Sequence, residues 1–358
     1  MRLDDLVEQL SQGYKHSPAA TIPGQIAPMA ELGIRAYKIY MVVDSGRTYP
    51  HPVGTGMHDH GQLLEMMDTI ARTGLRFIIH PHDQELMNYF ENHFLSRGEN
   101  TPAAYAQTLA DREGVIWDTT IDLILRLAEA SGCPVHIAHM QTRRSIEAVR
   151  RVKDNGFDVT CEVNHWALFL STWKDVETLG PYAPVVLGCR TTRARPSGTA
   201  CATARSTCAP PTTRPHTREE KEIGWTRMWS LHTGAPGVQY YYPLLLDSVG
   251  KGRLTLERVQ IVATAPSKAF GLDGVKGALK PGWDADFVVA DLERAVDHHE
   301  RGHVVQGCGW TPYDGRACGG ARRAHVRARP GSVRRRRRRG RHGRRATRGR
   351  GQAGGVGP

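Results

Sequence analysis

The chain has 358 residues, a formal net charge of +12 and a hydrophobic fraction of 40%. This length suits one large α/β domain or two ordinary ones. No stretch approaches the roughly 18 uninterrupted apolar residues of a membrane helix, and the first eighteen residues lack the apolar core of a secretory signal. The seven cysteines form no CxxC pair, which favours reduced thiols in a cytoplasmic protein.

The positive charge is concentrated in one segment. Residues 319–358 contain fifteen arginines and no acidic residue, including the run from Arg334 to Arg339. Removing these fifteen charges from the net +12 leaves −3, so the rest of the chain is mildly acidic. A nucleic-acid-binding arm is one interpretation, because clustered arginines release counterions from phosphate. The segment lacks interleaved aromatic residues that stack on bases, so we expect no specific nucleic-acid partner.

Residues 25–185 alternate between strand-like and helix-like segments. In chain order we predict a strand at 34–41, a helix at 62–73, a strand at 75–80, a helix at 116–130, a strand at 134–139, a helix at 144–155 and a strand at 157–163. Such alternation indicates parallel strands covered by helices. Further along, we predict a helical pair around a turn at 254–270 and a strand at 286–292.

Polar side chains fall at the C-terminal ends of the predicted strands. They are Lys38, His80, His139, Asn164 and His165. In a (β/α) barrel this edge is the catalytic face. A single histidine at a strand end is more often structural, but several at successive strand ends predict a functional site.

Lys38 lies within the apolar segment AYKIYM, where burial of an unmodified ammonium would be costly. One interpretation is a salt-bridged lysine, or one that extends its charge to solvent. The other is carbamylation by CO₂, which creates an anion whose two oxygens can bridge two metal ions. Imidazoles and carboxylates would complete such a pair, and the pair would activate the water that attacks an amide.

Several segments resemble those of the dihydroorotase, hydantoinase and allantoinase family of the amidohydrolase superfamily. GIRAYKIYM looks like the strand that carries the carbamylated lysine, and FIIHPHD and PVHIAHMQT resemble the next two ligand strands. CEVNHW, PHTREEKEIGW and GCGWTPYDG resemble later family motifs, and GALKPGWDADFVVADLE looks like the return to a small β-sandwich. The resemblance covers about residues 25–189 and 215–317.

The resemblance implies an α/β fold: an incomplete (β/α)8 TIM-type barrel that lacks its first strands, with a remnant of the β-sandwich. The expected organisation is a partial barrel over 1–275, the return to the sandwich over 276–317 and a disordered arginine-rich tail over 318–358. The implied activity is metal-dependent hydrolysis of a cyclic amide. PHTREEK and GWTPYDG favour dihydroorotate, while hydantoins, dihydropyrimidines and allantoin remain alternatives. An intact member is expected to be a homo-oligomer.

The resemblance also assigns two groups of site residues. The metal ligands, for two ions that we expect to be zinc, are Lys38 (carbamylated), His80 and His139. The substrate-side candidates are His216, Asn164 and His165. We predict that His136 is structural, because it is out of phase with His139 on the same strand and matches no motif.

Two parts of the family site are missing from the sequence. The family's His-x-His pair precedes the lysine, and none of the 37 residues before Lys38 forms such a strand. The triplet at 58–60 (His-Asp-His) follows the lysine, and we predict that it begins a helix. The family's catalytic aspartate, which moves a proton to the leaving nitrogen, is expected near position 212, where this chain has Thr212.

Residues 190–214 show no periodicity and contain no acid, which is typical of a flexible loop. A second interpretation is a reading-frame error in a GC-rich gene, because codons for Pro-Pro-Thr-Thr-Arg read two bases later can encode Thr-Asp-His-Ala. The composition after Ala317 suggests the same cause. We therefore expect little or no hydrolase activity from the chain as written. A non-catalytic amidohydrolase-like scaffold is the alternative.

Overall fold

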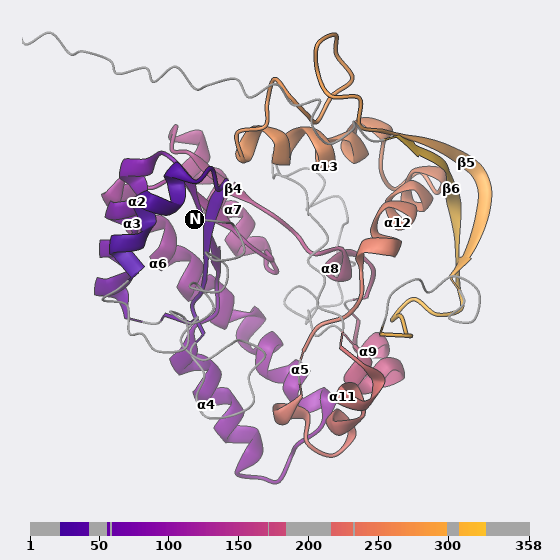
Figure 1. Cartoon of the computed structure of the whole chain (residues 1–358). Coiled ribbons are helices and arrows are strands. Elements are labelled where there is room, and N and C mark those ends of the chain that lie inside the picture. Colours follow the sequence, from indigo (N-terminus) through magenta and orange to yellow (C-terminus); the bar gives the residue numbers. More distant parts are fainter. Residues whose placement is uncertain are drawn as a thin grey trace, which may run out of the picture.

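The computed structural model describes residues 22–42, 56–57, 59–170, 172–183, 216–231, 233–298 and 308–326. A parallel sheet with its helices occupies one side of Figure 1, and a long antiparallel ribbon occupies the other. Every helix within these ranges is too short or too polar to cross a membrane.

The parallel sheet contains four strands in sequence order. They are β1 (Ala36–Tyr40), β2 (Arg76–His80), β3 (Val135–Ile137) and β4 (Val159–Cys161). Their register places Lys38, Ile78, His136 and Thr160 in one row across the sheet. Sequential parallel strands joined through helices are the repeating unit of a (β/α) barrel. The α/β class is therefore confirmed, with four of the parallel strands present in the described part of the chain.

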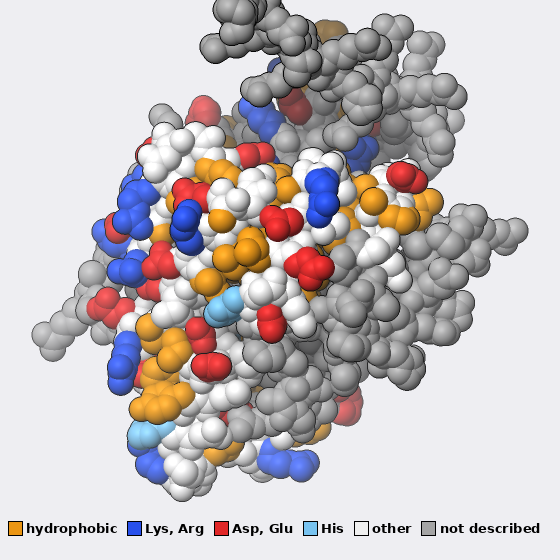
Figure 2. All heavy atoms as spheres, turned by 90° about the vertical axis from the view of Figure 1, so that its left-hand side faces the viewer, with side chains coloured by type: hydrophobic (Ala, Val, Ile, Leu, Met, Phe, Trp, Pro, Cys, Tyr) orange, Lys and Arg blue, Asp and Glu red, His pale blue; other side chains and the backbone are white. Residues whose placement is uncertain are grey.

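Four helices pack in sequence order along this sheet. They are α2 (Ile22–Glu31), α3 (His60–Thr73), α6 (Val115–Ser131) and α7 (Arg143–Asp154). Helix α3 buries Leu63, Met66, Met67 and Ile70 at helical spacing, and all four belong to the main hydrophobic core. Figure 2 looks onto this helical side, where acidic and basic side chains are interspersed among apolar ones. All seven elements predicted between residues 34 and 163 are present, with ends within two residues of those expected.

The start of α3 confirms the prediction for the His-Asp-His triplet. Asp59 is the N-cap, and its side chain accepts a hydrogen bond from the backbone N–H of Gln62. His60 is the first helical residue. His58 lies outside the described residues.

The remaining elements were predicted less completely. The helices are α4 (Gln84–Leu95), α5 (Pro102–Ala110), α8 (His165–Phe169), α9 (Trp173–Leu179), α11 (Arg218–Glu222), α12 (Val238–Gly250) and α13 (Leu256–Ala269), with 3₁₀ turns η1 (Asp111–Glu113), η2 (Gly180–Tyr182), η3 (Ile223–Trp225) and η4 (Met228–Ser230). The predicted helical pair at 254–270 is wrong, because one helix, α13, runs through this segment. Thr255 caps its start, and no turn interrupts it.

Strands β5 (Phe287–His298) and β6 (Arg316–Val326) form the antiparallel ribbon. Strand β5 is longer than the predicted strand at 286–292. Strand β6 extends from the segment expected to return to the sandwich into the first residues of the expected tail. The division into domains stays a prediction.

The ribbon is fastened to α12 through one buried carboxylate. Asp247 of α12 accepts a hydrogen bond from the backbone N–H of Gly319 at 2.8 Å, and from Lys251 Nζ at 2.7 Å. Asp247 is buried, and removing its carboxylate from water would be unfavourable without hydrogen-bond donors. The Gly319 N–H and the Lys251 ammonium are those donors. Helix α12 therefore positions strand β6.

Arg76, the first residue of β2, joins several elements at the N-terminal edge of the parallel sheet. Its Nη2 lies 2.7 and 2.9 Å from the two carboxylate oxygens of Asp158, and its Nη1 donates to the carbonyl of Val135 at 2.9 Å. Its Nε donates to the carbonyl of Ala269 at 3.0 Å, in the last turn of α13, where a cation is favoured. Arg76 is buried, so one side chain joins β2, β3, the segment before β4 and a helix 193 residues away.

Replacing Arg76 by methionine should lower the free energy of unfolding by about 2–3 kcal/mol, because buried carbonyl acceptors lose a charged donor. Urea unfolding measures the loss. Arg144→Met is the matched control: Arg144 also pairs with an aspartate, Asp122 at 3.0 Å, but both side chains are exposed. It should cost less than about 1 kcal/mol. Equal losses in the two variants would contradict the anchoring role of Arg76.

Candidate metal and substrate site

The three predicted metal ligands lie together at the C-terminal edge of the parallel sheet. His80 ends β2, and His139 follows β3 by two residues; their ring centroids are 4.9 Å apart. Tyr40, at the end of β1, lies 5.3 Å from the His80 ring. The Nζ of Lys38 lies 5.1 Å from the Tyr40 ring centroid. The site therefore draws on three neighbouring strands, as the parallel register requires.

His139 has an unusual backbone conformation. Its φ is 58°, in the left-handed region that non-glycine residues seldom occupy. Backbone hydrogen bonds on both sides hold this turn, from Ala138 N to the Ile79 carbonyl (3.0 Å) and from Met140 N to the Glu162 carbonyl (2.7 Å). Such strain persists only where the surrounding structure enforces it, and it is common at functional sites.

This turn brings His136 and His139 to one partner, although they were expected on opposite faces of the strand. After β3 the chain no longer alternates as a strand does, so His136 and His139 reach the same carboxylate, that of Glu162. His136 Nε2 lies 3.3 Å from Glu162 Oε2, and His139 Nδ1 lies 3.1 Å from Glu162 Oε1. His136 therefore contacts the site, although it does not match a ligand position.

Glu162 was not predicted, although it stands in the quoted segment CEVNHW. It follows β4 directly and is 5% exposed. Burial raises the pKa of its carboxyl, and hydrogen bonds from His136 and His139 lower it by more, so the pKa lies well below its usual range. Burial lowers the pKa of His139. Glu162 is thus an anion between two imidazoles.

Lys38 is less enclosed than its apolar neighbours suggested. Strand alternation places Tyr37 and Ile39 in the core, whereas Lys38 occupies the opposite face and is exposed. Its side chain reaches the surface of the protein on that face, within the enclosure of the site. The surrounding protein atoms still lower its pKa by desolvation, and Glu162 partly offsets this effect. A lowered pKa increases the fraction of neutral amine, which is the form that reacts with CO₂.

His82 is a second residue that the sequence analysis missed, although FIIHPHD contains it. Its Nδ1 lies 3.3 Å from His80 Nε2, and its ring packs edge-on against Trp117 with centroids 4.0 Å apart. His82 is buried. It therefore restricts the orientation of the His80 ring.

The donors fit part of a zinc centre. His80 and His139 provide imidazoles, and Lys38 would provide carbamate oxygens. Within the described ranges, no group of three His, Cys, Asp or Glu side chains could hold a metal ion. Among the described residues, Lys38 is therefore the expected third donor beside His80 and His139. Thr212, where the catalytic aspartate was expected, lies outside the described residues.

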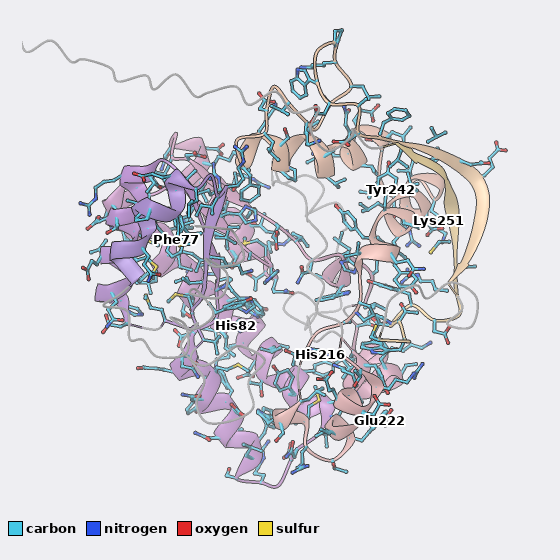
Figure 3. The ribbon with its side chains drawn as sticks, in the orientation of Figure 1. Phe77, His82, His216, Glu222, Tyr242 and Lys251 are labelled. Carbon is cyan, nitrogen blue, oxygen red and sulfur yellow. The ribbon has the colours of Figure 1, made fainter. Side chains whose placement is uncertain are left out.

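The substrate-side candidates occupy different surroundings. Asn164 is buried, and its Oδ1 lies 3.2 Å from His139 Nδ1. His216 precedes α11; its backbone carbonyl accepts from Trp310 Nε1 at 2.7 Å, and its Nδ1 lies 3.5 Å from Glu220 Oε2. In Figure 3, His82 and His216 are both labelled in the lower middle of the view, His82 toward the parallel sheet and His216 toward α11. The structure therefore brings Asn164 to the predicted ligands and joins His216 to Trp310 and α11.

His165 is fully buried. Its ring packs among Trp166, Tyr241 and Tyr313, with centroid distances of 5.0, 6.0 and 5.9 Å. Among the described residues, neither ring nitrogen has a hydrogen-bond partner. Burial lowers the pKa of His165 to about 3. As placed, the imidazole is a neutral packing element.

The PHTREEK and GWTPYDG motifs are joined through the buried side chains of Lys221 and Trp310. Besides its bond to His216, Trp310 lies beneath the ammonium of Lys221, with Nζ 5.8 Å from the ring centroid. Lys221 is buried and donates to the carbonyl of Gly234 at 3.2 Å. Burial lowers its pKa to about 7. These contacts join two segments about 90 residues apart in the chain.

Comparison with known proteins identifies relatives that hydrolyse cyclic amides. The chain is 29% identical over 280 residues to the L-hydantoinase of Paenarthrobacter aurescens, which covers 74% of the chain and 58% of that protein. It is 27% identical over 332 residues to the allantoinase of Rubrobacter xylanophilus (83% and 63%), and 32% identical over 197 residues to the dihydroorotase of Halobacterium salinarum (54% and 44%). The chain therefore spans roughly half to two thirds of these relatives. No family profile matches it.

The solved structure of L-hydantoinase (dihydropyrimidinase) from Arthrobacter aurescens has the same fold. The TM-score is 0.74 at 25% sequence identity, over 85% of this chain and 66% of that chain. The α/β fold class predicted from the sequence, that of a TIM-type barrel, is confirmed.

The buried neutral His165 should make the protein less stable in mild acid. Its ordinary pKa of 6.5 applies to the unfolded chain, which binds a proton as the pH falls below that value, whereas the folded chain does not until about pH 3. Stability is therefore lost as the pH falls through this window. Between pH 7 and 5 the wild type should lose about 2 kcal/mol more than His165→Phe, measured by urea unfolding. Parallel pH profiles for the two proteins would contradict this assignment.

Gly237→Ala tests the packing of His165 directly. A Cβ at position 237 would lie 2.3 Å from His165 Cε1, and the buried ring has no room to move. Overpacking of this kind costs about 1–3 kcal/mol, measurable as a lower thermal midpoint. Gly24→Ala is the control, because nothing lies within 4 Å of that Cβ in α2. It should be neutral or stabilising, and a similar loss there would remove the specific explanation.

Proposed function

We propose that this chain, which belongs to the family of hydantoinases, dihydroorotases and allantoinases, carries the lysine–histidine part of a metal centre for cyclic-amide hydrolysis. The observation that carries the proposal is the convergence of Lys38, His80 and His139 at one edge of the sheet. Zinc is the expected metal, because neutral imidazoles and a carbamate suit it.

Each residue would have a defined part in the reaction. His80 and His139 would hold the metal through ring nitrogens, and carbamylated Lys38 would hold it through oxygen. Bound zinc would lower the pKa of water and polarise the amide carbonyl. The leaving nitrogen must also receive a proton, and the residue expected to deliver it falls at Thr212. Without a carboxylate there, hydrolysis would stop short of carbon–nitrogen bond cleavage.

Dihydroorotate is the substrate favoured by the PHTREEK and GWTPYDG motifs, which pack together through Trp310. The extent of similarity does not separate it from the alternatives, because a D-hydantoinase, an allantoinase and a dihydroorotase match 81%, 83% and 82% of the chain. Hydantoins, dihydropyrimidines and allantoin therefore remain alternatives, and all of these substrates present a ring amide to the same metal chemistry.

The purified chain, with zinc and bicarbonate, should bind metal but show little or no turnover of dihydroorotate or hydantoin. Elemental analysis gives the stoichiometry, and ¹³C-bicarbonate labelling shows a carbamate carbon if Lys38 is modified. Lys38→Gln should remove the carbamate signal and weaken metal binding by about tenfold or more, since a three-donor site loses one donor. Lys268→Gln, an exposed lysine, is the control.

Turnover of about 1 s⁻¹ or more would show that the chain does supply a proton donor for the leaving nitrogen. It would contradict the expectation that hydrolysis stops before carbon–nitrogen cleavage. A folded oligomer without metal binding or a carbamate signal would reject the metal-centre proposal and support the scaffold alternative.

A further inference from the structure

We infer that Glu162 is a positioning residue: with His136 behind it, it holds His139 with its proton on Nδ1, so that Nε2 is the nitrogen presented to a metal ion. This inference rests on the proposed function for its purpose, but its structural content can be tested without metal.

The proton position on His139 follows from its partners. An ionised carboxylate can only accept hydrogen bonds, and Glu162 Oε1 lies 3.1 Å from His139 Nδ1. Nδ1 must therefore carry the proton. Asn164 Oδ1, at 3.2 Å from the same nitrogen, is a second acceptor for it. In a neutral imidazole the lone pair is then on Nε2, which is the atom left to bind a metal.

His136 carries its proton on the other ring nitrogen, Nε2, and its two partners fix this position as well. Its Nε2 lies 3.3 Å from Glu162 Oε2, so Nε2 donates to the carboxylate. Its Nδ1 lies 2.8 Å from Thr160 Oγ1, so the hydroxyl donates to Nδ1. His136 and Thr160 are register partners on β3 and β4. One directed series of hydrogen bonds therefore runs from Thr160 through His136 to Glu162, and His139 donates to the other oxygen of Glu162.

This hydrogen-bond network restrains the orientation of the His139 ring. The residue stands beyond the end of β3 at a φ of 58°, so the strand itself does not fix its ring. Glu162 supplies that restraint from the neighbouring strand, both through its side chain and through its carbonyl, which accepts from Met140 N. Partners that fix a ligand's ring and tautomer are typically worth 10–100-fold in metal affinity.

The first test is long-range ¹H–¹⁵N NMR of the histidine rings in the metal-free chain near neutral pH. His139 should show a protonated Nδ1 and an unprotonated Nε2, whereas His136 should show the reverse. A proton on Nε2 of His139 would overturn the inference, whatever the protein's affinity for metal.

Variants provide the second test, read out as cobalt(II) affinity and tautomer together. Glu162→Leu removes the charged acceptor and leaves only Asn164 Oδ1, so it should weaken cobalt binding by about 10–100-fold and raise the population of the other His139 tautomer. Glu162→Gln keeps one acceptor oxygen, so it should retain the His139 tautomer, shift the His136 proton to Nδ1 and weaken binding less. Glu65→Gln makes the same change on the exposed face of α3 and should alter neither reading.

The outcomes separate the two proposals. If the chain binds no cobalt, the proposed metal centre fails, and the wild-type tautomers alone decide the role of Glu162. If Glu162→Leu binds cobalt as tightly as the wild type, the positioning role is wrong even though the metal centre stands. If Glu162→Leu does not fold, the wild-type tautomers and the Glu162→Gln shift of His136 still decide the matter.

Discussion

The charge on Glu162 is the constraint around which the site is arranged. A carboxylate removed from water is unfavourable by several kcal/mol unless donors replace its hydration. Here the donors are two imidazoles on one neighbouring strand and the turn that follows it, so β3 and β4 must keep their register for the charge to be tolerated. The backbone carbonyl of Glu162 also accepts from Met140 N, beside the left-handed turn at His139. Strand pairing, backbone strain and imidazole orientation are therefore parts of one energetic balance.

The parallel sheet was predictable because its signals are local. Short apolar runs ended at polar residues, and the spacing between them suited covering helices. Once strands are parallel and sequential, their C-terminal ends must share one edge, so the convergence of Lys38, His80 and His139 followed from the pattern alone. The structure bears out this geometry, and their role as metal ligands stays a prediction.

Other features could not be read from local patterns. Alternation assigned His136 to the opposite face, because nothing in the segment PVHIAHMQT indicates that His139 leaves the strand with a positive φ. The same alternation, applied more strictly, would have shown that Lys38 shares no face with Tyr37 and Ile39. Arg76 looked like an ordinary strand residue, since its acceptor in α13 is 193 residues away. His82 and Glu162 were visible in quoted motifs, but their importance depends on distances that only the fold sets.

The link between Asp247 and strand β6 affects which amino-acid substitutions the ribbon can accept during evolution. The carboxylate accepts a hydrogen bond from the backbone N–H of Gly319, and β6 pairs with β5 through main-chain groups as well. Main-chain groups are the same whatever the side chains are, apart from proline. A segment held in this way tolerates wholesale replacement of its residues as long as it stays extended. The edge of this ribbon is thus a place where the sequence can drift, or even be rewritten, while the architecture beside it persists.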